Sequence, residues 1–242
     1  MDYLVQFRGG VARLDFQVQL RYFFKMSATE ESGSRHLTAR GAATRARIVN
    51  AAADLIYAGG VDRTSLDEVM AESGVSKSQL YHYFADKDAL VLEVIALQTE
   101  RVLSAQQPHL GALDSLKALR MWRDVIVQLN ERAGSNGCPL GSLASELANE
   151  SETARQRLAA GFAVWSDSIE RGLTKMRERG ALSPSAHPQE LAVALLSAVE
   201  GGLLLAKTTQ TSRPLEIALD MAIDHIARQI VPTSQRPLRK GR

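Results

Sequence analysis

Two helix-capping signals with a glycine between them constrain the fold of this chain more than any other feature. Ser65 is followed three residues later by Glu68, and Ser76 is followed three residues later by Gln79. This spacing lets each pair of side chains hydrogen-bond the first turn of a helix, so it marks two helix starts. Gly74 lies between them and suits the left-handed backbone of a sharp turn. The pattern therefore predicts two short helices joined by a tight turn, the helix-turn-helix arrangement.

Helical periodicity extends to both sides of this pair. Apolar side chains recur at three- and four-residue intervals over residues 42–58, and two glycines end the run. The first motif helix is predicted over residues 66–72 and the second begins after Ser76. Asp86 is placed to cap a fourth helix that reaches about Gln106. The sequence thus predicts a three-helix domain over residues 34–86, in which the helix-turn-helix supplies the second and third helices.

Further amphipathic helices are predicted for the rest of the chain. Apolar residues are spaced for helices over residues 113–133, 142–148 and 152–179, and Pro188 and Pro214 each suit the first turn of another. The segment 192–206 is apolar around most of its circumference and should be buried. Close approach of a neighbouring helix and a bend would each account for its Gly201 and Gly202. We predict an all-α protein with a larger helical domain over residues 87–231.

Composition excludes several classes of protein. Hydrophobic residues make up 45% of the 242 residues and charged residues 23%, which is typical of a folded protein with a core. The net charge of +2 excludes a highly basic packaging protein. A single cysteine, Cys138, excludes an intrachain disulfide framework and a cysteine-based zinc finger. We find neither a bilayer-length apolar run nor a secretory signal, so we expect a cytoplasmic protein with no membrane partner.

The two ends of the chain differ from its body. Alternating apolar and polar residues near Phe16 have the period of a strand that would lack a partner. Residues 1–33 are therefore predicted to be an extension that is disordered or mis-assigned. Either Met26 is the natural start and residues 1–25 come from an over-extended reading frame, or these residues form a poorly ordered arm. Residues 232–242 form a basic tail that is either solvated or in contact with DNA.

The capped pair resembles the DNA-binding domain of TetR-family (TetR/AcrR) transcriptional regulators. The stretch that carries the resemblance, residues 64–90, reads TSLDEVMAESGVSKSQLYHYFADKDAL, and the similarity extends over residues 42–95. Met70 departs from the family, which usually places alanine where the two helices cross. The resemblance implies an N-terminal DNA-binding domain, a small-molecule pocket among the middle helices, and a homodimer formed by the last two helices.

The motif indicates how DNA would be contacted. The second helix of a helix-turn-helix enters the major groove with its N-terminal residues toward base edges. There, Gln79 could pair with adenine and Lys77 with guanine. The start of the first motif helix favours a phosphate, and residues after the base-reading turn should reach other phosphates, whereas Tyr83 and Phe84 should pack inside. The predicted DNA-binding residues are Thr64, Ser65, Ser76, Lys77, Ser78, Gln79, Tyr81, His82 and Lys87.

Charge adds a qualification to the DNA-binding prediction. Residues 34–95 carry seven Lys and Arg against eight Asp and Glu, so we expect low nonspecific affinity for DNA. Four arginines nevertheless cluster before and within the first helix, where an arm could follow the minor groove. These are Arg35, Arg40, Arg45 and Arg47. Arg35 and Arg40 could equally belong to a solvated tail.

An effector pocket is predicted for the larger domain on the strength of the resemblance. Because ligand sites are largely apolar, the effector should be an apolar or aromatic small molecule. Each residue could instead fill the core. Cys138 lies in a turn similar to one in a branch of the family that includes electrophile sensors, so a redox or electrophile switch is the alternative. The predicted pocket residues are Trp122, Cys138, Leu140, Phe162, Trp165 and Met176.

Enzyme motifs are absent from the sequence. It contains no G-x-S-x-G, H-E-x-x-H or G-x-G-x-x-G pattern, and its five histidines show no metal-ligand spacing. These absences argue against a helical enzyme and against a metal or cofactor. From the helix-turn-helix motif and the resemblance, we predict a sequence-specific transcriptional regulator. The resemblance implies a ligand-responsive repressor that binds a palindromic double-stranded operator.

Overall fold

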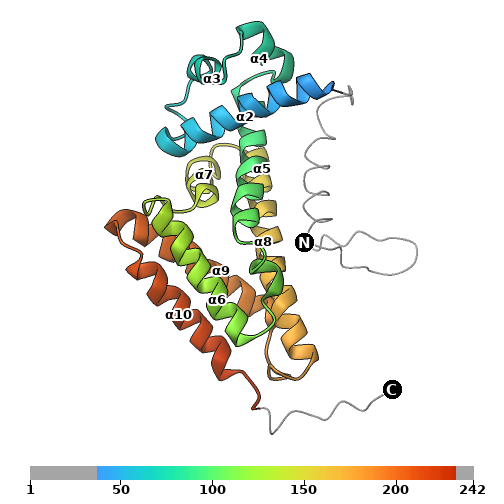
Figure 1. The fold of residues 1–242 in the computed structure, drawn as a ribbon, viewed down its shortest axis with the longest axis vertical. Coiled ribbons are helices and arrows are strands. Elements are labelled where there is room, and N and C mark those ends of the chain that lie inside the picture. Colours follow the sequence, from blue (N-terminus) through green and yellow to red (C-terminus); the bar gives the residue numbers. More distant parts are fainter. Residues whose placement is uncertain (1–36, 233–242) are drawn as a thin grey trace, which may run out of the picture. The chain divides into compact units, whose positions relative to one another are not determined.

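The computed structural model describes residues 37–232, and this part of the chain consists of helices joined by turns and loops (Figure 1). Apart from one isolated bridge between Leu182 and Ile230, it contains no β-structure. The all-α prediction is confirmed. The predicted N-terminal extension and residues 233–242 of the predicted tail lie outside the described residues. The helices are α2 (Ala39–Gly59), α3 (Leu66–Ser73), α4 (Lys77–Tyr83), α5 (Lys87–Ala105), the 3-10 helix η1 (Leu110–Ala112), α6 (Leu116–Arg132), α7 (Pro139–Leu147), α8 (Glu152–Glu178), α9 (Pro188–Thr209) and α10 (Arg213–Arg228).

Side-chain caps explain where most of these helices begin. An oxygen of the capping residue accepts a backbone N–H of the first turn, which would otherwise lack a partner. The capping residues are Thr38, Ser65, Ser76, Asp86, Ser115 and Ser151. Two predicted helix starts were wrong by three residues. Because Ser115 is the cap, α6 begins at Leu116, and α7 begins at Pro139 because proline suits a first turn.

The N-terminal helices share a small core. α2 buries Ile48, Ala52 and Ile56, and it packs against α3 and α5. Leu80 of α4 and Phe84, which follows it, are almost fully buried in the same region. Since α5 contacts both α2 and α8, it connects the N-terminal helices to the remainder. Asp86, the capping residue of α5, lies at the domain boundary predicted after residue 86. The division of the chain into domains remains a prediction.

Close helix packing in the larger half depends on glycine. A Cβ atom on Gly202 of α9 would lie 2.8 Å from the Cα of Leu215 in α10, which is too close for a side chain. Gly202 therefore permits α9 and α10 to approach each other, as one of the two sequence interpretations proposed. The neighbouring Gly201 is exposed, and its Cβ would meet nothing within 4 Å.

The helix predicted to be buried, α9, is only partly covered. Among the described residues it is the one helix long and apolar enough to span a membrane by length and composition, although the sequence analysis found no such segment. It packs on α8 and α10, as Figure 1 shows, and so has the position of a core helix. Only 44% of its most apolar window is buried. Its exposed side includes Val193, Leu204 and Leu205, which are 54%, 63% and 55% exposed.

Candidate nucleic-acid interface and effector pockets

Both predicted capping boxes form, and they hold α3 and α4 around a tight turn. The Ser65 hydroxyl accepts the Glu68 N–H at 3.2 Å, and a Glu68 carboxylate oxygen accepts the Ser65 N–H at 2.8 Å. Ser76 and Gln79 repeat this arrangement at 3.3 and 2.9 Å. Gly74, with φ of 63°, ends α3 in the left-handed conformation. Local hydrogen bonds thus fix the position at which α4 leaves the turn.

One face of α4 is buried and the other is open to solvent. Leu80 is 0% exposed and anchors the helix on the core. Lys77, Ser78, Tyr81 and His82 are exposed, together with Ser76 and Gln79. Six of the nine predicted DNA-binding residues therefore share one short, accessible segment. Such a polar helix face, free of a protein partner and rigidly mounted, is what a major-groove reading helix requires.

Gln79 has a role in the free protein that competes with base reading. Its Oε1 accepts the Ser76 N–H, which leaves only its amide NH2 free to donate. A bidentate pair with adenine needs both groups. To read adenine in the way the sequence suggested, the Gln79 Oε1 must therefore either accept a second hydrogen bond or leave the capping box.

Three of the predicted DNA-binding residues lie at the edge of the exposed face of α4 or away from it. Thr64 is 5% exposed and its hydroxyl donates to Gly60 O, so it closes the turn after α2. Ser65 is exposed, but the Glu68 carboxylate occupies the start of α3 beside it. This hydrogen bonding with Ser65 lowers the pKa of Glu68. The negative charge of the Glu68 carboxylate opposes binding of a phosphate at the start of α3. The ammonium group of Lys87 donates to Val61 O at 2.6 Å.

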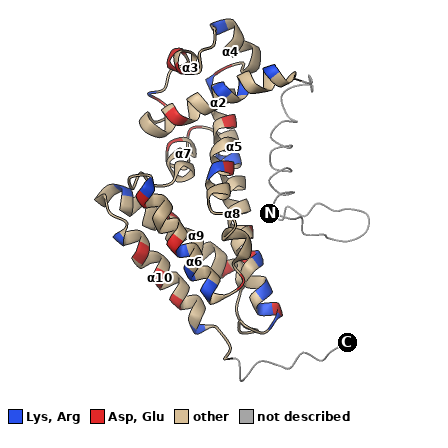
Figure 2. Cartoon of the chain, in the orientation of Figure 1, with Lys and Arg blue, Asp and Glu red and all other residues tan. Residues whose placement is uncertain are grey.

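The arginines of α2, which Figure 2 colours blue together with all other Lys and Arg, are the remaining candidates for DNA contact. Arg45 pairs with Glu93 at 2.8 Å and lies over the Phe84 ring, 5.4 Å from its centroid, so it secures the core of this domain. Arg40 and Arg47 are exposed. Arg35 lies outside the described residues. The predicted packing of Phe84 is confirmed, whereas Tyr83 is only half-buried.

A groove of about 490 Å³ runs between α8 and α9 in the larger half. Its apolar lining includes Phe162, Val193 and Leu196. Three carboxylates, Asp167, Glu170 and Glu200, also line it, and sequence reasoning missed all of them as site residues. Glu200 could have been found, because a glutamate in the middle of a strongly apolar helix is unusual.

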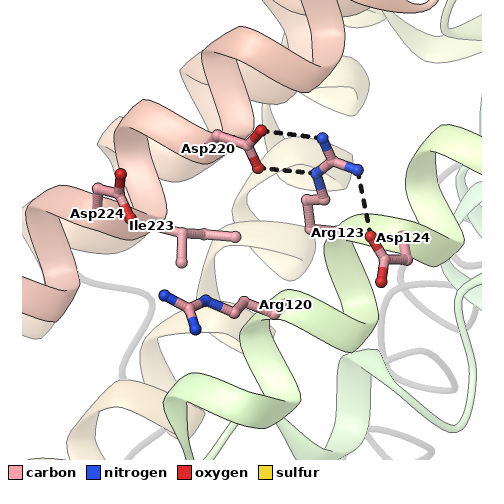
Figure 3. Close-up of a pocket in the computed structure, with 6 residues that line it drawn as sticks. All are labelled: Arg120, Arg123, Asp124, Asp220, Ile223 and Asp224. Atoms are coloured by element: carbon pink, nitrogen blue, oxygen red, sulfur yellow. Dashed lines mark hydrogen bonds and ion pairs between the residues drawn. The ribbon is translucent and has the colours of Figure 1, made fainter.

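A second hollow, of about 390 Å³, lies between α6 and α10 (Figure 3). There Arg123 donates to both carboxylate oxygens of Asp220, at 2.9 and 3.0 Å, and to Asp124 at 3.2 Å. Arg120 extends from α6 toward α10 in the same hollow. The Arg123 guanidinium already has protein carboxylates as partners. Its ion pair with Asp220 holds α6 against α10.

Comparison with known proteins places both halves of the chain in one family. The model described as bacterial regulatory proteins, tetR family, matches residues 48–94. The model described as the LmrA/YxaF-like C-terminal domain of transcriptional regulators matches residues 116–221. An HTH-type transcriptional regulator of Mycobacterium tuberculosis is 32% identical over 72% of this chain and 89% of its own length. The chain belongs to the TetR family of transcriptional regulators.

Other relatives agree with this assignment. The HTH-type regulator YxaF of Bacillus subtilis is 30% identical over 74% of this chain and 92% of its own. The crystal structure of a TetR transcriptional regulator from Chloroflexus aurantiacus superposes with a TM-score of 0.70 and 26% identity. That alignment covers 80% of this chain and 98% of the other. As a TetR-family protein, the chain is a DNA-binding transcriptional regulator and not an enzyme.

The residues predicted to form an effector pocket in this TetR-family protein are dispersed. Phe162 lines the groove between α8 and α9. The other five, which line neither hollow, are buried: Trp122, Cys138, Leu140, Trp165 and Met176. Trp122 donates its indole N–H to Gln106, whereas the buried Trp165 indole has no hydrogen-bond partner. Their assignment to a pocket remains a prediction, and in this conformation they fill the core.

Cys138 is in an environment that disfavours the thiolate. It is 7% exposed and precedes the first turn of α7. Burial, together with the nearby Glu200 carboxylate, raises the pKa of the thiol well above its ordinary value. The backbone N–H groups of Gly141 and Leu140 offset part of this effect. Reactive cysteines need a lowered pKa and access to solvent, and Cys138 has neither.

α7 contacts the DNA-binding helices of the TetR-family protein near both of its ends. Near its start, the Tyr57 hydroxyl of α2 donates to Gly137 O at 3.3 Å. In its last turn, the Glu146 carboxylate accepts the Val61 N–H at 2.6 Å.

Within residues 37–232, no group of three or more His, Cys, Asp or Glu side chains is arranged to hold a metal ion.

Proposed function

We propose that this chain is a ligand-responsive repressor that binds a palindromic operator as a homodimer. In this proposal, α4 reads base edges in the major groove and the larger half binds a small molecule. Ligand binding changes the separation of the two recognition helices, so that they no longer fit successive major grooves. Its place of action is the cytoplasm. Repression is the usual mode of action in the family that the sequence resembles.

The observation that carries the proposal is the exposed polar face of α4. Lys77 and Ser78 are exposed on the first turn, and Tyr81 and His82 are exposed on the turn that follows. Leu80 and the two capping boxes keep this face in a fixed orientation. A bidentate contact between a side chain and a base discriminates by about 1–3 kcal/mol, so a few such residues suffice to specify a half-site.

Homodimer formation is supported by apolar side chains left exposed on the last two helices. Leu204 and Leu205 on α9 are joined by Ile217 and Met221 on α10, which are 44% and 68% exposed. Ile217 and Met221 are four residues apart, so they lie on one side of α10. Burying such a face against a second copy removes apolar surface from water. Exposed Gly201 would let the partner's helices approach closely.

Ligand responsiveness is supported by the contacts of α7. This helix joins the wall of the groove to the turn after α2 through Glu200, Gly141 and Glu146. A ligand shifts a two-state equilibrium only by its differential affinity for the two states. A compound that displaced Glu200 from the first turn of α7 would have such a differential affinity. The buried state of Cys138 favours this mode of control over an electrophile switch.

In vitro selection from random duplex DNA, using the purified full-length protein, tests the proposal. We expect enrichment of a palindrome whose half-sites are about one helical turn apart, or a multiple of that distance. The selected duplex should bind one or more protein dimers, measured by analytical ultracentrifugation. Absence of enrichment at low salt, from protein shown to be folded and dimeric, would contradict sequence-specific operator binding.

A further inference from the structure

The groove between α8 and α9 has properties that the proposed function leaves unexplained. Its lining includes the apolar side chains of Phe162, Val193 and Leu196. Carboxylates line it as well. We propose that this groove binds a small organic cation with an apolar body, and that this cation is the effector. The inference rests on the proposed function, because only a ligand-responsive regulator needs an effector.

Charge complementarity selects the cation. Asp167, Glu170 and Glu200 line the groove, and no lysine, arginine or histidine is among the described residues that do so. Asp167 and Glu170 also interact with other groups of the protein, so Glu200 is the carboxylate that the cation would pair with. An anion would be repelled here, and a neutral compound would gain nothing from the carboxylates. Opposite charges a few ångströms apart attract more strongly in a partly buried groove than in water.

Glu200 is the carboxylate best placed to pair with the cation. Its Oε1 is buried and makes no hydrogen bond, which is costly for an ionised group. Burial accordingly raises the pKa of this carboxyl. Because Oε1 has almost no exposed surface, the Glu200 side chain must turn toward the groove before a bound ammonium group supplies the missing partner. A volume of about 490 Å³ accommodates a compound with one or two aromatic rings, since small-molecule sites span about 300–1,000 Å³.

The same carboxylate contacts α7, which links the groove to DNA binding. The other oxygen of Glu200 lies against Gly141, at a position where any side chain would collide with it. Glu200 also hydrogen-bonds the Cys138 thiol. A cation that attracted Glu200 toward the groove would remove these contacts from the first turn of α7. The last turn of α7 holds the Val61 N–H through Glu146, so the displacement has a path to the DNA-binding helices.

Three probes with one apolar body and different charge test the proposal: phenylbutylammonium, phenylbutanol and phenylbutyrate. Their affinities for the full-length dimer are measured by isothermal titration calorimetry. We expect the cation to bind at least about tenfold more tightly than the alcohol and the anion to bind most weakly. Glu200→Gln should abolish the preference for the cation and leave the affinity for the alcohol unchanged. Phe162→Ala should weaken binding of the cation and the alcohol alike.

Glu190→Gln is the matched control, because Glu190 is an exposed carboxylate on α9 that does not line the groove. Equal affinities for the three probes, or a cation preference that survives Glu200→Gln, would overturn the proposal. So would a result in which the groove variants alter only the dimer dissociation constant, because the partner chain would then occupy the groove. Operator binding is measured separately for each variant. Loss of operator binding in the parent protein would contradict the proposed function, whereas loss of cation binding alone would contradict this inference.

Discussion

The Glu146 carboxylate accepts the backbone N–H of Val61 at 2.6 Å, and this bond joins the last turn of α7 to the turn that follows α2. The contact is close, because a Cβ on Gly60 would lie 3.0 Å from the same carboxylate. The Lys87 ammonium group donates to the carbonyl oxygen of the same residue, Val61, at 2.6 Å. The turn after α2 is thus held from α5 and from α7 together.

Glu146→Ala should therefore loosen this turn without unfolding the protein. A hydrogen bond of this kind contributes about 1 kcal/mol to the free energy of unfolding, and the exposure of Glu146 keeps the value from being larger. We expect faster hydrogen exchange at the Val61 amide, measured by mass spectrometry or NMR. Glu150→Ala, which changes an exposed carboxylate just beyond α7, is the control. Unchanged exchange at Val61 would show that the bond does not hold the turn in solution.

Gly202→Ala should destabilise the contact between α9 and α10. The new Cβ would lie 2.8 Å from Leu215 Cα, so the helices must move apart. Overpacking of this kind costs about 1–3 kcal/mol, which urea unfolding measures directly. As a control, Gly59→Ala places a Cβ in open space at the end of α2. A Gly202→Ala variant as stable as the parent would contradict the close approach of these helices.

Cys138 should react slowly with iodoacetamide. Burial and the Glu200 carboxylate raise the pKa of the thiol, so little thiolate is present at neutral pH. The reaction should accelerate as the pH rises, and it should become fast when urea exposes the side chain. Mass spectrometry follows the single modification, and Cys138→Ser identifies its site. Rapid alkylation of the folded protein at neutral pH would instead revive the electrophile-sensing alternative.

The free energy of unfolding of Glu200→Gln should increase relative to that of the parent protein as the pH rises. Burial raises the pKa of Glu200 above its ordinary value of 4.5, and the hydrogen bond with Cys138 only partly opposes this. A group whose pKa is raised by folding contributes stability below its unfolded pKa, and that contribution is lost as the pH rises through the folded pKa. Glutamine cannot ionise and avoids this loss. Thermal unfolding from about pH 4 to about pH 8 tests the trend, with Glu190→Gln as the control for removing an exposed carboxylate from α9.

The sequence predicted the DNA-binding half well because its signals are local. Ser65 with Glu68 and Ser76 with Gln79 each act within a single helix turn, so the caps and the orientation of α4 follow from residues close in the chain. The outcome for Gln79 shows the limit of this reasoning. Its two predicted roles use the same oxygen, and only the structure shows which role that oxygen has in the free protein.

The larger half was harder to predict because its grooves depend on tertiary packing. The large apolar residues at Trp122 and Trp165 suggested a pocket, yet they fill the core in this conformation. The groove instead combines the exposed side of α8 with Glu200, whose proximity to Cys138 comes from residues 62 positions apart. Helical periodicity reports which face of a helix is apolar, and it does not report which helix covers that face.

Selection of duplex DNA by the parent protein and by two variants of α4 tests the central claim most directly. Lys77→Ala removes an exposed side chain at the N-terminus of the recognition helix. Gln79→Glu keeps an oxygen acceptor for the Ser76 N–H, now as a carboxylate, and removes the amide donor. We predict a palindrome for the parent, with loss of preference at defined positions of each half-site in each variant and about 1–3 kcal/mol less discrimination there. An identical consensus from all three proteins would contradict base reading by α4.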